Sequence, residues 1–217
     1  MASSQIISAR QKWLESDNIF KDAFNTKIDN HADKHCFGKN FRPLSWSDLM
    51  CSVSPFLSEY TAIDNVEICT AATAWTTHTG QLYILIFGQG LCFGERMDIS
   101  LINPNQCRSY GISPCGDPKE PHRTLGFQRN TLNIPLFVEG TIATMSTRCP
   151  SLEEIESCQY IYLSEQESWD LSNVNFNILE IVMSKIERED ILCLDSSSID
   201  IILKFTFGGS QLSWSER

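Results

Sequence analysis

No apolar run in this sequence approaches the ~18 residues that a helix needs to cross a bilayer, and this absence argues against a membrane-spanning protein. The opening residues Met1–Arg10 also lack the charged and then apolar layout of a secretory signal peptide. From these two absences we expect a cytoplasmic protein with no membrane partner.

Basic residues are outnumbered, because 17 Lys and Arg stand against 27 Asp and Glu and leave a formal net charge of −10. Phosphate backbones repel such a surface, and the sequence contains no cluster of Lys and Arg. Nucleic acid is therefore not an expected partner. The acidic surplus favours solubility and says little about the substrate.

Paired metal-binding cysteines are also absent. The nine cysteines are scattered and none forms a Cys-x-x-Cys pair, which argues against a zinc ribbon or knuckle. Their odd number and the missing export signal indicate reduced, mostly buried thiols in a reducing compartment. Gly88, Gly90 and Gly94 are too loosely spaced for a phosphate-binding loop, so no cofactor is expected.

The middle of the chain has the texture of a β domain. From about residue 27 to 145, short apolar runs alternate with turn residues, as in mainly β proteins. The continuous apolar run Leu82–Phe87 suits a strand that is covered on both faces. The strands expected from these runs are 66–75 and 81–87, joined by a turn at 77–80, and a further pair at 123–127 and 131–138.

Capping residues mark two short helices. Asn103 is suited to cap a helix, Pro104 to its first position, and Gly111 to the left-handed residue after its end. Ser151 and Glu154 have the spacing of a capping box. The two helices expected are 104–110 and 152–158.

Both ends of the chain are harder to interpret. Apolar residues within 4–24 have a loosely helical spacing. Near the other end, the pattern over 177–187 is helical, whereas 191–194 and 199–207 are more typical of strands. We therefore expect helical and strand extensions on either side of the β domain.

The segment Lys27–Cys36 lies at the start of the β-rich region and carries a resemblance to a known family. Its hydrophobic residue followed by Asp29 resembles the hydrophobic-Asp-Ser/Thr-Gly-Ala active-site loop of retroviral-type aspartic proteases. The copia-type version often continues Ser-Ser-His-Met, and His35 falls at that histidine. Some copia-like elements of algae and fungi are similar to this chain in having an Asp-Asn-His-Ala-Asp loop. The loop residues that follow Asp29 are Asn30, His31, Ala32 and Asp33.

A second block, Leu91–Gln106, looks like the copia-type segment that reads roughly Val-Leu-Tyr-Val-Pro, a gap, and then Asn-Leu-Leu-Ser-Val-x-Gln-Leu. In the resembling fold, a strand turns sharply past the catalytic loop at this point and leads into a short helix. The resemblance therefore implies a second turn beside Asp29, and it covers roughly 28–165. The residues of this second turn are Leu101, Ile102 and Asn103.

The resemblance implies a mainly β, retropepsin-like closed barrel with one short helix after the second turn. It divides the chain into an N-terminal helical extension (1–26), a protease domain (27–165) and a C-terminal extension of uncertain fold (166–217). A hairpin formed by 49–55 and 66–75 would carry the flap that covers the substrate. The flap residues would be Pro55, Phe56 and Glu59.

The implied activity is hydrolysis of peptide bonds in a polyprotein, with Asp29 as the catalytic carboxylate. Such a domain supplies one carboxylate, so the pair that shares a proton requires a homodimer. Leu194–Ser198 faintly resembles a second loop, but too few residues follow it to build a second flap and helix. The expected partners are therefore a peptide or polyprotein substrate and a second copy of the chain.

Two loop positions depart from the family pattern. Asn30 replaces the usual Ser or Thr, which braces the loop against the partner's loop, and an Asn side chain still donates and accepts hydrogen bonds. His31 replaces a Gly, which permits a positive φ and close backbone approach. An alternative is therefore a catalytically inactive module for self-association or peptide binding. In the plainest interpretation, Asp29 is an ordinary turn residue.

A second alternative is a metal-dependent hydrolase. His31, Asp33 and His35 occupy alternate positions, so on a strand all three would face one side, as metal ligands could. A zinc site needs a fixed set of paired ligands, however, and no second ligand pair appears elsewhere in the sequence. We therefore expect no metal.

Overall fold

The computed structural model of the chain describes residues 24–54, 59–119, 124–129, 132–165 and 169–170. The chain divides into two compact units, Met1–Leu171 and Ser172–Arg217, and all the described residues belong to the first. The helical pattern expected before residue 24 and the elements expected after residue 171 lie outside the described residues. So do the flap residues Pro55 and Phe56.

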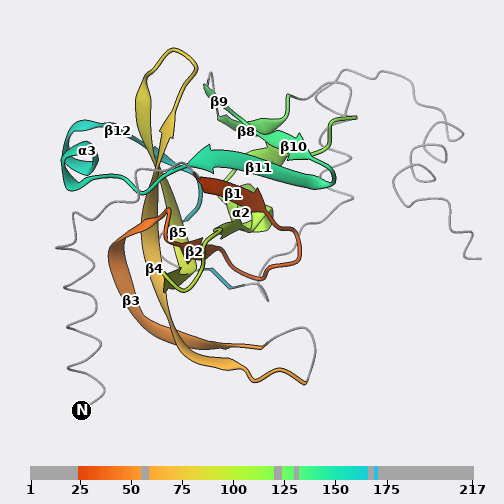
Figure 1. Cartoon of the computed structure of the whole chain (residues 1–217), viewed down its shortest axis with the longest axis vertical. Coiled ribbons are helices and arrows are strands. Elements are labelled where there is room, and N and C mark those ends of the chain that lie inside the picture. Colours follow the sequence, from red (N-terminus) through yellow and green to blue (C-terminus); the bar gives the residue numbers. More distant parts are fainter. Residues whose placement is uncertain (1–23, 55–58, 120–123, 130–131, 166–168, 171–217) are drawn as a thin grey trace, which may run out of the picture. The chain divides into compact units, whose positions relative to one another are not determined.

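Strands dominate the described part of the chain, as the turn spacing predicted (Figure 1). The two described helices are short, and neither is long and apolar enough to span a membrane. The helices are α2 (Pro104–Ser109) and α3 (Leu152–Ser157). The strands are β1 (Phe24–Ile28), β2 (Cys36–Gly38), β3 (Arg42–Val53), β4 (Ile63–Thr76), β5 (Leu82–Gly94), β6 (Leu101–Ile102), β7 (Ser113–Cys115), β8 (Gly126–Arg129), β9 (Leu132–Pro135), β10 (Phe137–Glu139), β11 (Ile142–Thr147) and β12 (Gln159–Tyr162).

The described strands form two sheets. The larger has nine strands in the order β10-β11-β1-β6-β2-β5-β4-β3, with β12 paired to β5 beside this path, and the smaller has the order β7-β8-β9. Among these strands no closed barrel is found, because β10 and β3 remain as the two edges of the larger sheet. Three register shifts between β3 and β4 mark bulges, which increase twist. In Figure 1 the hairpin of these two strands curves away from β2.

Local signals in the sequence located several elements correctly. β3 pairs with β4 and β4 pairs with β5, both antiparallel, as the expected hairpins require. The β4–β5 turn is closed by the Thr77 N–H, which donates to the Gln81 carbonyl at 2.8 Å. In α2 the Asn103 side chain accepts from the Asn105 N–H at 2.7 Å, and Gly111 has a φ of +80°. The capping box of α3 is complete.

Two expected boundaries differ from the observed elements. The domain boundary drawn at residue 27 falls inside β1, which begins at Phe24. The strand expected over 131–138 is two strands, β9 and β10, separated by the buried Leu136. β9 belongs to the small sheet and β10 to the large one, so the chain changes sheets there. Pro135 has no N–H to donate, which suits the end of a strand.

Aromatic rings form the centre of the main core. Phe37 stacks on Phe41 at 4.9 Å between centroids, and Phe41 and Phe127 each lie edge-on to Phe87. All four side chains are fully buried. The apolar run of β5 is buried without alternation from Ile84 onward, which confirms that this strand is covered on both faces. The core therefore extends directly beneath β2 and β5.

A buried polar network ties the strands around β1 together. The Asn40 side-chain amide donates to Thr26 Oγ1 at 2.8 Å and to Thr147 Oγ1 at 2.9 Å. The Ser100 hydroxyl donates to Asn40 Oδ1 at 2.5 Å and accepts from the Gly38 N–H at 2.8 Å. One side chain thus connects β1 and β11 to the segment leading into β6. Every polar group in this set has a partner, as buried polar groups require.

The thiols agree with a reduced state. The eight cysteines in the described residues are all free, and four of them are buried while the other four are half-buried. Reduced thiols remain a prediction, and the prediction that most are buried holds for half of these eight.

Candidate functional site

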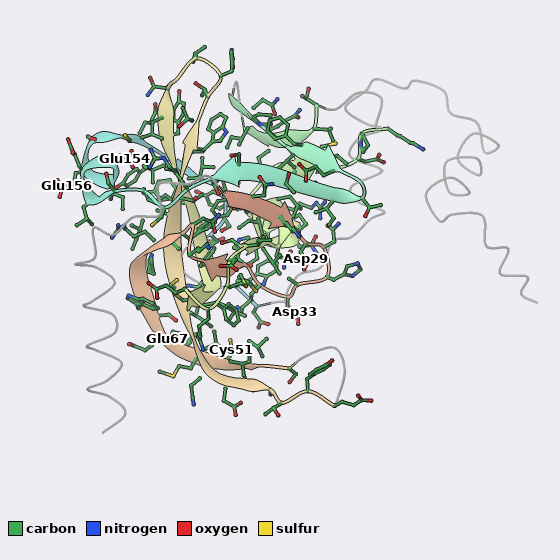
Figure 2. The ribbon with its side chains drawn as sticks, in the orientation of Figure 1. Asp29, Asp33, Cys51, Glu67, Glu154 and Glu156 are labelled. Atoms are coloured by element: carbon green, nitrogen blue, oxygen red, sulfur yellow. The ribbon has the colours of Figure 1, made fainter. Side chains whose placement is uncertain are left out.

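Asp29 directly follows β1, beside the second turn. β6 runs parallel to β1, with Lys27 opposite Leu101 and Ile28 opposite Ile102. The Asp29 N–H donates to the Ile102 carbonyl at 2.9 Å. The predicted proximity of Asp29 and this turn is therefore confirmed. Figure 2 shows Asp29 at the end of β1 and Asp33 further along the same loop.

The topology explains this proximity. After Asp29 the chain forms β2 and the two long hairpins, and it then returns as β6 in the gap between β1 and β2. β6 pairs parallel with β1 and antiparallel with β2. Since α2 begins immediately after Asn103, the start of this helix is held beside the Asp29 loop.

The Asp29 carboxylate is half-buried and partly engaged. Its Oδ1 atom accepts the His31 backbone N–H at 2.9 Å, which is the geometry of an Asx turn. Among the described residues no partner is found for Oδ2. One oxygen is thus held by the backbone of the loop. This geometry suits both the turn interpretation and the catalytic one.

The His31 backbone adopts an ordinary conformation. Among the described non-glycine residues only Asn65 and Gln89 have a positive φ, so His31 does not occupy a conformation that requires glycine. The His31 side chain is exposed, as are those of Asn30 and Asp33, whereas Ala32 is half-buried. The departure from glycine therefore introduces a side chain at the surface without straining the loop.

The side chain of His35 holds the far end of the loop in place through two hydrogen bonds. The ring is fully buried, and its Nδ1 accepts the Asn103 backbone N–H at 3.0 Å. Nε2, which carries the proton in this arrangement, donates to Ser164 Oγ at 3.1 Å. Burial, with a smaller contribution from the Lys34 charge, lowers the pKa of His35 to about 3. The ring is therefore neutral and joins three separate parts of the chain.

The residues of the metal alternative do not converge. Both ring nitrogens of His35 are used within the protein, while His31 and Asp33 are exposed. In the described ranges no group of three His, Cys, Asp or Glu side chains could hold a metal ion. The expected alternation fails because only Cys36–Gly38 forms a strand, and the loop before it is irregular.

Gln106 of α2 holds the His35 backbone. Its Oε1 accepts the His35 N–H at 2.6 Å, and its amide donates to the Gln89 carbonyl at 3.3 Å. Gln106 belongs to the block that resembles the copia-type segment, so the sequence carried a signal for it. Ser164 and Trp169, which also contact this region, had no such signal.

The β3–β4 hairpin lies where a flap was expected. The Ser52 hydroxyl on β3 donates to Asp64 Oδ1 on β4 at 2.5 Å, which ties the far ends of the two strands together. Glu59 is exposed. Large apolar side chains near the far end are also exposed, including Tyr60 at 65% and Leu49 at 62%.

An apolar cluster on this hairpin also includes Cys36, the residue that follows the loop. Val66, Ile68 and Leu91 form its buried centre, and Cys36 and Cys51 pack against them. Burial raises the pKa of the Cys36 thiol to about 11, and the Asp29 and Cys51 charges contribute. Cys36 is therefore a protonated thiol and is unsuited to act as a nucleophile.

An open pocket of about 440 Å³ lies beside the start of the same loop. Ile28 and Asn30 line it together with Arg108 of α2. Residues 114–118 and the side chains of Thr141 and Ala143 complete its walls. Asp29, which lies between two of these lining residues, is not itself part of the pocket lining.

Comparison with protein-family models, with curated proteins and with solved structures gives no significant match for this chain.

Proposed function

We propose that this chain is a retropepsin-like aspartic endopeptidase of the copia type, which acts as a homodimer on a polyprotein with Asp29 as its catalytic carboxylate. The supporting observation is the hydrogen bond from the Asp29 N–H to the Ile102 carbonyl across the parallel β1–β6 pair. The resemblance of the Asp29 loop and the second block to the copia-type segments implies that these two parts of the chain lie side by side.

Three further features are consistent with this proposal. The helix α2 begins directly after the second turn, as in the resembling fold. The long β3–β4 hairpin includes the stretches 49–53 and 66–75, from which the resemblance implies a flap. Asn30 is exposed, so its amide is accessible to the loop of a second chain.

The chemistry follows from two Asp29 side chains that face each other. Two carboxylates in hydrogen-bonding contact share one proton, because both cannot ionise easily. The ionised carboxylate takes a proton from water as the water oxygen bonds to the scissile carbonyl carbon, while the protonated one donates to the carbonyl oxygen. In the collapse of the tetrahedral intermediate, the carboxyl that took the proton from water gives it to the nitrogen, and the other carboxylate takes back the proton of a diol hydroxyl. The C–N bond breaks, an amine and a carboxylic acid are released, and the pair again shares one proton.

The test is digestion of a peptide library by the full chain between pH 4 and 7. Asp29→Asn keeps nearly the same shape but cannot act as a base, and it is expected to abolish cleavage. Asp33→Asn is the matched control, because Asp33 is an exposed carboxylate of the same loop. Pepstatin, which mimics the tetrahedral diol, should block cleavage, and a chelator should not. Equal cleavage by wild type and Asp29→Asn would remove Asp29 from the mechanism.

The exposed His31 side chain favours one alternative, a non-catalytic module that self-associates or binds peptides. Its imidazole projects from the loop that two chains would bring together, and this bulk opposes close contact between the loops. In that case wild type cleaves nothing, Asp29→Asn changes nothing, and His31→Gly gains activity. The same digest therefore separates the two functions.

A further inference from the structure

The chain returns to the Asp29 loop after β12. We call Leu163–Glu165 together with Trp169–Asp170 the return segment; these residues lie far along the chain from the loop they contact. The segment begins where the Leu163 N–H donates to the Ile86 carbonyl at 2.9 Å, continuing the pairing of β12 with β5. Leu163 and Ser164 are buried. The segment is therefore built into the domain.

Trp169 contacts the middle of the loop. Its indole Nε1–H donates to the Asp33 carbonyl at 2.9 Å. Its own carbonyl accepts from the Lys34 ammonium at 3.0 Å. The two bonds run in opposite directions between one tryptophan and two consecutive loop residues, so they fix both the position and the orientation of this stretch.

Ser164 contacts the end of the loop. Its Oγ accepts from His35 Nε2 at 3.1 Å and from the Gly88 N–H at 2.9 Å. The serine hydroxyl thereby connects the loop's histidine to the backbone of β5. Since His35 also accepts the Asn103 N–H, Ser164 acts on the second turn through the same ring.

We propose that Trp169 and Ser164 are positioning residues for the Asp29 carboxylate, which makes the return segment a part of the active site. This inference rests on the proposed function. β6 fixes the start of the loop at Asp29, and the His35 contacts fix its end. Between them, Trp169 is the residue outside the loop that holds the main chain at Asp33.

The physical effect of this restraint is on the geometry of the reacting groups. The Asp29 carboxylate is oriented by the His31 N–H, which belongs to the same loop. If the loop's middle shifts, this N–H moves with it and the carboxylate loses its fixed orientation. A misplacement of about 1 Å in a catalytic group can cost about 100-fold in rate. Substrate contacts made by the hairpin are unaffected, so the effect is on kcat and not on KM.

Trp169→Phe is the principal variant, because it keeps an aromatic ring and removes the Nε1–H donor. In the full chain we expect kcat for a cleaved peptide to fall about tenfold with an unchanged KM. Hydrogen exchange of the peptide that covers residues 29–35 should become about two- to tenfold faster, since one hydrogen bond is lost. Tyr160→Phe is the control, because it removes an exposed hydroxyl of β12 that bonds the Ile155 carbonyl away from the loop. It should change neither quantity.

Ser164→Ala tests the second contact. The substitution leaves two donors without their acceptor, His35 Nε2–H and the Gly88 N–H. The melting temperature of this variant is therefore measured first, to show that it still folds. A melting temperature close to that of wild type, with kcat reduced, supports the positioning role. Unchanged exchange or unchanged kcat in Trp169→Phe overturns the inference, whatever Ser164→Ala does. If wild type cleaves nothing, the proposed function and a catalytic positioning role fail together. Faster exchange in Trp169→Phe would then still show that Trp169 restrains the loop.

Discussion

Acidification should destabilise the fold through His35, even though the proposed activity calls for mildly acidic conditions. The ring is fully buried, and both nitrogens are committed to partners, Nδ1 as an acceptor of the Asn103 N–H. Protonation would place a charge in the core and a hydrogen on Nδ1, where the backbone N–H already points. Burial, assisted by Lys34, accordingly holds the pKa of His35 at about 3 in the folded protein.

The sign and size of the effect follow from linkage. In the unfolded chain a histidine has a pKa of about 6.5, so below that pH the unfolded state binds a proton that the folded state refuses. The stabilisation is fully present above pH ~6.5 and is lost as pH falls towards ~3. The slope is about 1.4 kcal/mol per pH unit, so the free energy of unfolding drops by about 2 kcal/mol between pH 7 and pH 5. The total free energy of unfolding of a small domain is only about 5–15 kcal/mol.

Urea denaturation at half-unit steps from pH 7 to pH 4 measures this loss, with His35→Gln as the comparison. Glutamine can accept and donate a hydrogen bond but does not titrate in this range. All other ionisable groups are shared, so the difference in unfolding free energy between the two proteins isolates His35. Wild type should lose about 1.4 kcal/mol more per pH unit between pH 6 and 4. Parallel curves for the two proteins would refute a neutral, buried His35.

The remaining predictions concern the polar network, a helix cap, a left-handed glycine and the loop. Asn40→Ala should lower the free energy of unfolding by about 2–4 kcal/mol, because buried hydroxyl and amide groups lose partners; a loss below about 1 kcal/mol in urea melts would contradict the network. Ser151→Ala should cost about 1 kcal/mol in the same assay, with little effect on cleavage, since it removes the α3 cap; an unchanged midpoint would be inconsistent with the cap. Gly111→Ala should cost about 1 kcal/mol because of the positive φ and not because of a clash, as open space surrounds the site. His31→Gly should preserve or raise peptide cleavage in the proposed protease, and a loss of cleavage with unchanged stability would instead give the imidazole a catalytic part.

The features that the sequence predicted well depend on neighbouring residues. The caps of α2 and α3 are recognisable because a helix end is satisfied by side chains within three positions. The β4–β5 hairpin was recognisable because two apolar runs flank a short polar turn ending in Gly80. The contact between Asp29 and Ile102 has no such local cause, and only the resemblance of two separate blocks indicated it.

The features that the sequence did not predict depend on pairing between distant segments. Thr26 of β1 contacts Thr147 of β11, which lies 121 positions further along the chain, and neither residue type indicates the other. A closed barrel was expected from the family pattern, but closure depends on how β10 and β3 are aligned at the two sheet edges. The sequence placed Trp169 only in an extension after residue 165. A single tryptophan does not indicate which backbone carbonyl its indole N–H will bond, which here is that of Asp33.

The position of β1 between β6 and β11 has a consequence for the order of events during synthesis. In the described sheet both neighbours of β1 come later in the chain, and the second of them ends at Thr147. When the ribosome has made only the first half of the domain, β1 has no strand to pair with, while the β3–β4 and β4–β5 hairpins already have theirs. Contacts of such long sequence separation form late and slowly. In a nascent chain, the Asp29 carboxylate therefore reaches its final position only after most of the domain has left the exit tunnel.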